Sequence, residues 1–336
     1  MINYLYILDR NLLFTKAIAM TNSIQGTENP DILLGTFGND EIMSLGGNDT
    51  IIGTAGSDIL DGGDGIDTVD FSSFTKKITL FPQGVFSNGS QQNGQLVSIE
   101  KIVAPVGFNN EINASSARGG VSLDVDLSKN SLIVNDVPGI GTQTFTVKNF
   151  VEVKGTVQSD ILIGNEANNK LVGKGGNDFL SGSGGNDTLR GDSGNDTLTG
   201  TDSVFRGAGE KDILSGNGFG TNTYILGDEE GSFYQAQSNR DLAVIRDFSF
   251  GELIQLGANE TYNIENNNAG FNVFLTTDSQ KDLIARVRFD IAVSESVSFA
   301  PQALSINSLE ADLSKALEGE FTIASGEIVS DIFIGA

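Results

Sequence analysis

The sequence predicts an all-β solenoid with two repeat blocks, a β-rich spacer between them and a C-terminal β-cap. Three observations carry this prediction. Aspartates recur every nine residues in two separate blocks, and a large apolar residue stands two places after each of them. Glycine makes up 42 of the 336 residues while proline makes up only 5, which suits many tight turns and argues against a collagen-like or proline-rich disordered chain.

The repeat unit is a nonapeptide with two nearly constant positions. In the first block it reads GTENPDILL, GTFGNDEIM, SLGGNDTII, GTAGSDILD and GGDGIDTVD. In the second it reads GTVQSDILI, GNEANNKLV, GKGGNDFLS, GSGGNDTLR, GDSGNDTLT and, after a break, GAGEKDILS. Position 6 is Asp in ten of the eleven units, and position 8 is Leu, Ile or Val in all eleven. Such regular spacing predicts a repeating structural unit.

Each unit is interpreted as one strand and one turn. Side chains alternate along a strand, so positions 7 to 9 form a short strand whose middle residue faces inward. Positions 1 to 6 form a turn in which glycine permits positive φ. Two units complete one coil, so residues 18 apart stack at about 4.8 Å. We therefore expect Asp31, Asp49 and Asp67 on one edge, Asp40 and Asp58 on the other, and Asp160, Asp178 and Asp196 opposite Asn169 and Asp187.

The stacked aspartates predict bound cations. Carboxylates at that spacing repel by about 3–4 kcal/mol per pair at an effective dielectric constant of about 20. Carboxylate and carbonyl oxygens suit a hard cation, and Ca²⁺ accepts six to eight flexible oxygens where Mg²⁺ requires an octahedron. We expect several Ca²⁺ ions. The candidate ligands are Asp31, Asp40, Asp49, Asp58, Asp67, Asp160, Asn169, Asp178, Asp187, Asp196 and Asp212. The alternative is that these residues only cap turns.

The repeats resemble the RTX, or haemolysin-type, calcium-binding nonapeptide GGxGxDxUx, in which U is a large apolar residue. GKGGNDFLS, GSGGNDTLR and GDSGNDTLT are most similar to it. The resemblance implies a parallel β-roll with calcium in successive turns, export by a type I system, and a secreted protein of bacterial type. Asn169 and the TENP sequence at residues 27–30 depart from the pattern and weaken their turns. The seven-residue stretch GTDSVFR leaves Asp212 out of the stack.

The spacer, residues 71–154, is expected to continue the solenoid in wider coils without metal. Residues 121–134 and 142–153 alternate apolar and polar side chains, which predicts a half-buried strand in each, and residues 107–114 look like a decayed repeat. Its acids include Glu100, Glu111, Asp124 and Asp126, of which the last two are expected to face solvent. A carboxylate-pair glycosidase needs a cleft and a raised pKa, and the sequence shows neither.

The expected domain boundaries follow from these segments. Residues 1–25 form a leader without ordered structure, 26–70 the first repeat block, 155–226 the second, and 227–300 a β-cap similar to that of many cyanobacterial and other bacterial RTX proteins. An open solenoid end exposes edge strands, so a cap is needed. Residues 301–336 are expected to hold a short helix at 307–317 and a secretion tail ending in SDIFIGA. A signal peptide at residues 1–20 is the rival route of export, although Asp9 and Arg10 interrupt its apolar stretch.

Composition excludes several function classes. The formal net charge of −24 argues against binding to nucleic acid or to an anionic membrane. The absence of Cys and His excludes disulfides, Cys-His zinc sites and Ser-His-Asp catalysis. No stretch has the apolar length of a transmembrane helix.

The leading hypothesis is a secreted, calcium-folded, non-enzymatic protein, extracellular or at the cell surface, with calcium and a surface or matrix polysaccharide as partners. The rivals are a carboxylate-based polysaccharide-acting enzyme with an RTX export module, and a pore-forming toxin, for which long apolar segments are missing.

Overall fold

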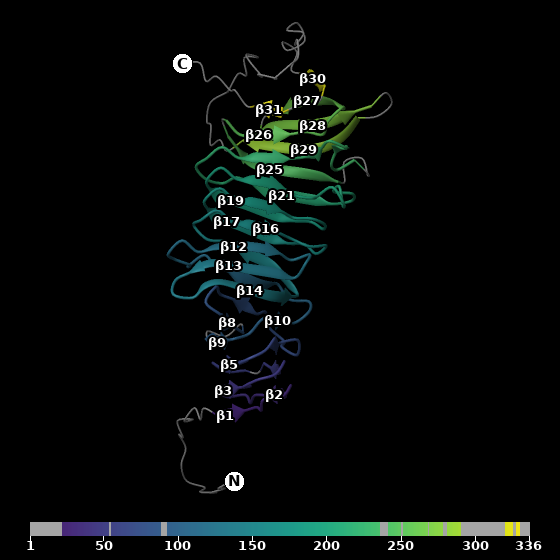
Figure 1. Ribbon diagram of the computed structural model, residues 1–336. Coiled ribbons are helices and arrows are strands. Elements are labelled where there is room, and N and C mark those ends of the chain that lie inside the picture. Colours follow the sequence, from purple (N-terminus) through teal and green to yellow (C-terminus); the bar gives the residue numbers. More distant parts are fainter. Residues whose placement is uncertain are drawn as a thin grey trace, which may run out of the picture.

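The protein is an elongated stack of short strands (Figure 1). The computed structural model describes residues 22–53, 55–88, 93–235, 241–249, 251–267, 269–277, 281–289, 320–324 and 327–329. These residues contain no helix. Two long sheets enclose a single apolar core that runs the length of the stack, from β1 at one end to the β27–β30 strands at the other. The predicted all-β solenoid is confirmed.

Successive strands of the repeats belong alternately to a first and a second sheet. In spatial order the first sheet consists of β1 (Asn22–Gln25), β3 (Asp40–Met43), β5 (Ile59–Asp61), β9 (Asn93–Val97), β8 (Val85–Ser87), β7 (Thr79–Leu80), β11 (Asn110–Asn113), β15 (Phe150–Lys154), β17 (Lys170–Gly175), β19 (Thr188–Ser193), β21 (Lys211–Ser215), β25 (Leu242–Phe248), β29 (Lys281–Phe289), β28 (Gly270–Thr276), β27 (Thr261–Asn267) and β30 (Glu320–Ala324).

The second sheet contains the other strand of each coil. In spatial order it consists of β2 (Ile32–Leu34), β4 (Thr50–Ile52), β6 (Thr68–Asp70), β10 (Lys101–Val103), β14 (Gly141–Lys148), β13 (Ser131–Val137), β12 (Ser122–Asp126), β16 (Ile161–Ile163), β18 (Phe179–Ser181), β20 (Thr197–Thr199), β22 (Thr223–Ile225), β26 (Leu253–Gln255) and β31 (Glu327–Val329). A small hairpin, β23 (Gly227–Asp228) and β24 (Gly231–Ser232), lies apart from both.

The strand register confirms the predicted 18-residue coil. Parallel pairs join Leu33 to Ile51, Ile42 to Leu60, and Leu162 to Leu180, in each case 18 residues apart. The position-8 side chains face inward as expected: those from Ile42 to Leu214 are fully buried, and Leu33 in the first coil is partly buried. Packing of these two apolar ladders, one from each sheet, therefore sets the phase of the turns.

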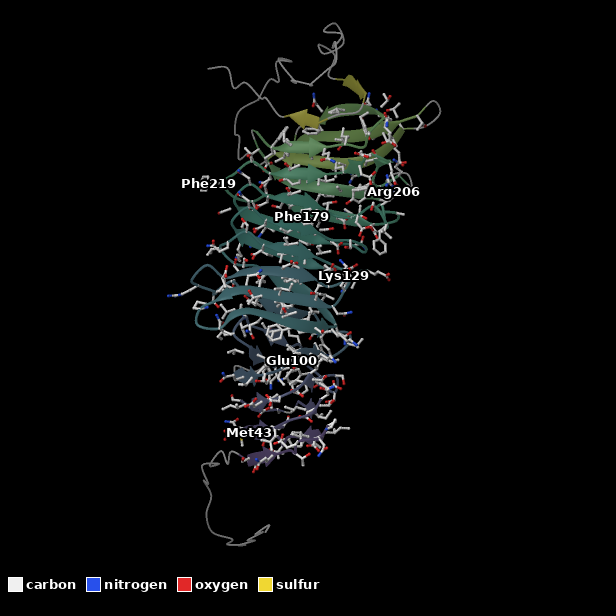
Figure 2. The ribbon with its side chains drawn as sticks, in the orientation of Figure 1. Met43, Glu100, Lys129, Phe179, Arg206 and Phe219 are labelled. Atoms are coloured by element: carbon white, nitrogen blue, oxygen red, sulfur yellow. The ribbon has the colours of Figure 1, made fainter. Side chains whose placement is uncertain are left out.

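The break before the last repeat of the second block does not displace Asp212, so this prediction was wrong. Leu189 pairs with Leu214, and the Asp187 N–H donates to Asp212 Oδ1 at 2.8 Å. Gly200 stacks on Gly182 as the first residue of the turn, and the extra residues form an outward loop whose middle, Ser203 and Val204, is exposed. Their last member, Arg206, lies at the edge of the roll, where it pairs with Asp228 (Figure 2). A loop can absorb the extra residues because the strand pairing on both sides is unaffected.

The spacer continues both sheets but adds antiparallel strands to each. β10 pairs with β6 and β14, and β11 pairs with β7 and β15, all in parallel. β8 and β13 are inserted antiparallel between their neighbours. The predicted single strand at 121–134 is instead the β12–β13 hairpin, which turns at Asn130 with φ of 57°. The segment 142–153 crosses between sheets at Asn149, with φ of 66°.

Two predictions about spacer side chains have different outcomes. Asn110 in the decayed repeat behaves as a position-6 residue, because its Oδ1 accepts the Ile78 N–H at 2.9 Å. Asp126 was expected to face solvent but is buried, since the chain turns directly after it and Lys129 and Ser128 bind its carboxylate.

At the C-terminal end the stacking changes from parallel to antiparallel. β25 and β26 continue the two sheets in parallel, whereas β27, β28, β30 and β31 pair antiparallel with their neighbours. Within the expected cap and its approach, Tyr224, Phe248 and Ile254 are fully buried. The helix expected at 307–317 and the tail at 330–336 lie outside the described residues, as do residues 1–21. β1 occupies residues 22–25, within the segment expected to be a leader. No helix that could cross a membrane occurs in the described part of the chain.

Candidate metal sites in the repeat turns

The position-6 side chains form ladders along both edges of the roll. In each ladder one carboxylate oxygen, Oδ1, accepts the backbone N–H of the position-6 residue one coil earlier. This bond joins Asp31 to Asp49, Asp40 to Asp58, Asp49 to Asp67, Asp160 to Asp178, Asn169 to Asp187, Asp178 to Asp196 and Asp187 to Asp212, at 2.7–3.0 Å. The predicted edges are therefore confirmed, and Oδ1 is satisfied by the backbone.

The second carboxylate oxygen divides the turns into two classes. At Asp31, Asp40 and Asp160, Oδ2 accepts the backbone N–H of a threonine at position 2, at 2.6 Å in each case. The threonine hydroxyl is also within hydrogen-bond distance of the same carboxylate. In these three turns Oδ2 is therefore satisfied by donors of the same turn.

Two further turns are saturated in other ways. In the Asn169 turn, Asn165 N–H donates to Asn169 Oδ1, and the Asn169 amide donates to the Val151 carbonyl. In the Asp212 turn, the buried Tyr234 hydroxyl donates to Asp212 Oδ2 at 2.6 Å. We call these five the closed turns, named by their position-6 residues: Asp31, Asp40, Asp160, Asn169 and Asp212.

The remaining six turns leave a buried carboxylate oxygen without a donor. We call them the open turns. In each, Oδ2 is buried and has no hydrogen-bond partner among the described residues: Asp49, Asp58, Asp67, Asp178, Asp187 and Asp196. An unpaired buried carboxylate oxygen is costly, so these turns need a counter-charge that the described residues do not supply.

The backbone at position 2 distinguishes the two classes. Leu45, Lys174, Ser183 and Asp192 have φ between 71° and 88° at this position of four open turns. Such φ values are strained for residues other than glycine. The threonines of the closed turns are not among the residues with positive φ, and their N–H groups point at the carboxylate. Strain at position 2 thus accompanies the loss of the N–H donor.

Glycine at position 1 gives the carboxylate its space. A Cβ built on Gly182 would collide with Asp187 Oδ2, and one built on Gly191 would collide with Asp196 Oδ2. The carboxylate therefore lies against the backbone at the start of its own turn, where neighbouring carbonyl groups are close.

Burial makes the carboxylates of Asp58, Asp67, Asp178, Asp187 and Asp196 reluctant to ionise. Burial raises the pKa of Asp178 to about 8 and that of Asp187 to about 9, and nearby acids add to both shifts. Burial also raises the pKa of Asp58 to about 6, and it raises the pKa values of Asp67 and Asp196. A cation at these turns would reverse the shifts because it stabilises the ionised form.

The donor set of the open turns fits a hard cation. Each turn offers an unpaired carboxylate oxygen in a glycine-rich bend, with oxygen as the ligand atom and neither nitrogen nor sulfur ligands from Cys or His. Within the described residues no three acidic side chains converge on one point. Carbonyl oxygens of the turns would have to complete the coordination, as calcium permits and magnesium resists.

Sequence reasoning missed the residues that close turns and end ladders. The signal was present at position 2, where Thr27, Thr36, Thr156 and Asn165 can donate to the carboxylate. Thr54, the position-2 residue of the Asp58 turn, lies outside the described residues.

The ladders also end on polar side chains that the nonapeptide pattern does not reveal. Asp67 N–H donates to Glu100 Oε2, labelled in Figure 2, and Asp196 N–H donates to Asn222 Oδ1. Asn222 in turn donates to the buried Glu252. Only the fold brings Tyr234, Glu100 and Glu252 to the ladders.

Comparison with known proteins agrees with the repeat geometry. A family model described as the RTX calcium-binding nonapeptide repeat (4 copies) matches residues 21–51, 34–69 and 163–198. No curated protein matches the chain. The solved structure of extracellular lipase LipA from Serratia marcescens aligns with 14% identity and a TM-score of 0.21, over 79% of this chain and 38% of the lipase chain. That likeness is too low to carry an argument. The family match and the aspartate ladders together lead to one conclusion: both repeat blocks of this chain contain RTX calcium-binding nonapeptide repeats of the haemolysin type.

Proposed function

We propose that this protein binds calcium ions in its six open turns, folds on binding them, and acts outside the cell without catalytic activity. The observation that carries the proposal is the set of six buried, unpartnered Oδ2 atoms, all of which belong to residues within the matched repeats. The closed turns bind no metal, because their four carboxylates already accept two or more protein donors and the amide of Asn169 carries no charge.

Calcium-dependent folding follows from the energetics of the open turns. Each burial of an unpaired ionised carboxylate opposes folding, and each bound ion at 10 to 100 times its Kd contributes about 1.4–2.7 kcal/mol. Several such sites together exceed a typical domain stability. The RTX repeats support export in the unfolded state by a type I system, with folding where calcium is abundant.

The spacer supports a non-catalytic role. Burial acts to raise the pKa of Glu111, but hydrogen bonds from Lys154 and Lys77 outweigh it and lower that pKa. Asp126 is likewise bound by Lys129, and its pKa is lowered. Neither carboxyl is poised as a general acid. A panel of surface and matrix polysaccharides, scored for both hydrolysis and binding, tests this part of the proposal and its polysaccharide partner.

The experiment is a calcium titration of chelator-treated protein, followed by circular dichroism, with magnesium as the control. We expect cooperative gain of β-structure with calcium alone. Metal analysis at saturation should give no more than the six ions that the open turns can hold. Identical spectra with and without calcium, or equal folding by magnesium, would contradict the proposal.

A further inference from the structure

Glu210 reaches a repeat turn from outside the nonapeptide pattern. It lies just after the outward loop that follows Gly200, directly before β21. Its Oε1 accepts the N–H of Gly185 at 2.8 Å. Gly185 is position 4 of the open turn that contains Asp187, so the carboxylate of Glu210 contacts this turn from the next coil.

At comparable turns a backbone carbonyl occupies this place. Gly47 and Gly194, also at position 4 of open turns, donate their N–H groups to the carbonyls of Asp64 and Phe219 in the following coil, at 2.9 and 2.8 Å. The inserted loop removes the equivalent carbonyl from Gly185 and replaces it with a carboxylate. A neutral oxygen acceptor has thus been exchanged for a charged one at a single turn.

The second oxygen of Glu210 makes no hydrogen bond of ordinary geometry. Oε2 is buried and has no such partner among the described residues. The same holds for Asp187 Oδ2, on a side chain only 1% exposed. Burial raises the pKa of Glu210, and hydrogen bonds from the Gly185 N–H and, more weakly, from the Thr201 side chain offset only part of that shift.

The charged groups that shift the pKa of Glu210 are acids. Asp202 and Asp241 act on Glu210, and Glu210 in turn acts on Asp187 and Asp212. Each of these interactions is a repulsion between acids. A bound cation would offset this repulsion, and the two unpaired oxygens of Asp187 and Glu210 are available to hold one.

The Asp187 turn also differs from other open turns in the residue that follows it along its ladder. The next carboxylate along this edge, Asp212, is closed by the Tyr234 hydroxyl. Asp49 and Asp178, by contrast, are each followed in their ladder by another open-turn aspartate. An ion at Asp187 therefore gains no carboxylate from Asp212, and Glu210 is the acid positioned to replace it.

We propose that Glu210 is a calcium ligand, and that it joins Asp187 to form a two-carboxylate site at the end of the second repeat block. This inference rests on the proposed calcium binding of the open turns. Affinity for calcium rises with the number of charged ligands. This site is consequently the tightest on its edge of the roll, and it anchors the inserted loop to the repeats when calcium is bound.

The test compares Glu210→Gln with Glu166→Gln in the full-length protein. Gln at 210 keeps an oxygen for the Gly185 N–H and removes only the charge. Glu166 is an exposed residue in the closed Asn169 turn and serves as the matched control. Calcium binding is measured by titration calorimetry against a competing chelator. We expect E210Q to weaken one binding step by about tenfold or more, with the other steps unchanged, and E166Q to match the wild type.

A second measurement separates ligation from a structural role. Urea unfolding in EGTA should give E210Q a midpoint equal to or above that of the wild type, because the variant removes a buried like charge. Wild-type affinity at every step in E210Q would overturn the inference, as would an equal loss of stability with and without calcium. A wild-type protein that binds no calcium would instead overturn the proposed function.

Discussion

The two classes of turn predict that the same substitution at neighbouring positions in one ladder depends on calcium at one position and not at the other. Asp160 and Asp178 are 18 residues apart, and the Asp160 N–H donates to Asp178 Oδ1 at 2.8 Å. Asp160 belongs to a closed turn and Asp178 to an open one. Replacing either with Asn changes one oxygen to an amide nitrogen and removes one charge, with little change in volume.

The magnitudes follow from the contacts. Asp178→Asn removes an oxygen that accepts no protein donor, so its cost should appear only with calcium: about 2.7 kcal/mol at a calcium concentration of about 100 times Kd, or about 5–10 °C in Tm. Asp160→Asn places a donor against the Thr156 N–H, which lies 2.6 Å from Oδ2. That change should cost about 1–3 kcal/mol with or without calcium.

Thermal unfolding in EGTA and in calcium, followed by circular dichroism, measures both effects. The predicted result is a Tm loss that depends on calcium for D178N and one that does not for D160N. An equal calcium-dependent loss in both variants would refute the division into open and closed turns. So would a D178N loss that is the same in EGTA.

Three further predictions concern pH, ladder closure and turn glycines. Because burial raises the folded-state pKa of Asp187 from 3.8 to about 9, the native state binds more protons than the unfolded state between these values. Stability in EGTA should therefore fall as pH rises through this range, which urea midpoints measure. Calcium affinity should rise over the same range and binding should release protons, which calorimetry in two buffers measures. The opposite trends would count against the burial argument. Tyr234→Phe removes the donor to Asp212 Oδ2 and should lower the free energy of unfolding in EGTA by about 1–3 kcal/mol. The loss in calcium should be smaller, because an ion can bind the freed carboxylate. No change in the EGTA urea midpoint would mean that the hydroxyl is not needed. Gly182→Ala, whose Cβ collides with Asp187 Oδ2, should abolish one calcium-binding step in calorimetry. A variant that keeps every calcium-binding step of the wild type would show that the turn can relax around the added methyl group.

The nonapeptide pattern was enough to predict the coil, its 18-residue register and the inward position 8. Those features depend on spacing alone. Each short strand has one inward-facing apolar side chain, so Ile51 stacks on Val69 of the next coil. The same spacing predicts that Asp49 and Asp67 are neighbours on one edge, and the hydrogen bond from the Asp49 N–H to Asp67 Oδ1 confirms it.

Other features depend on contacts that spacing does not record. Asp212 remains in its ladder because strand pairing fixes β21 while the loop bulges outward, and counting residues along the chain gives the wrong answer. Tyr234 reaches that aspartate from 22 residues away. The β12–β13 hairpin was hidden because alternation continues through both strands, and only the left-handed Asn130 turns the chain.

The closed turns could have been recognised from sequence, with the right physical question. Threonine at position 2 offers a backbone N–H and a hydroxyl to the carboxylate four residues later, as at Thr36 and Asp40. Asking which donors saturate each aspartate, instead of counting aspartates, separates most closed turns from open ones. Two turns are exceptions. The donor to Asp212 comes from outside the repeat, and the Asp58 turn has Thr54 at position 2 although Asp58 Oδ2 has no partner among the described residues.

The most direct test of the account locates the ions themselves. Anomalous X-ray scattering from crystals grown in calcium would show which turns hold a metal. We predict calcium peaks at the open turns, which contain Asp49, Asp58, Asp67, Asp178, Asp187 and Asp196. We predict none at the closed turns of Asp31, Asp40, Asp160, Asn169 and Asp212. Peaks distributed over both classes, or open turns without calcium, would contradict the claim that unpaired carboxylate oxygens determine where calcium binds.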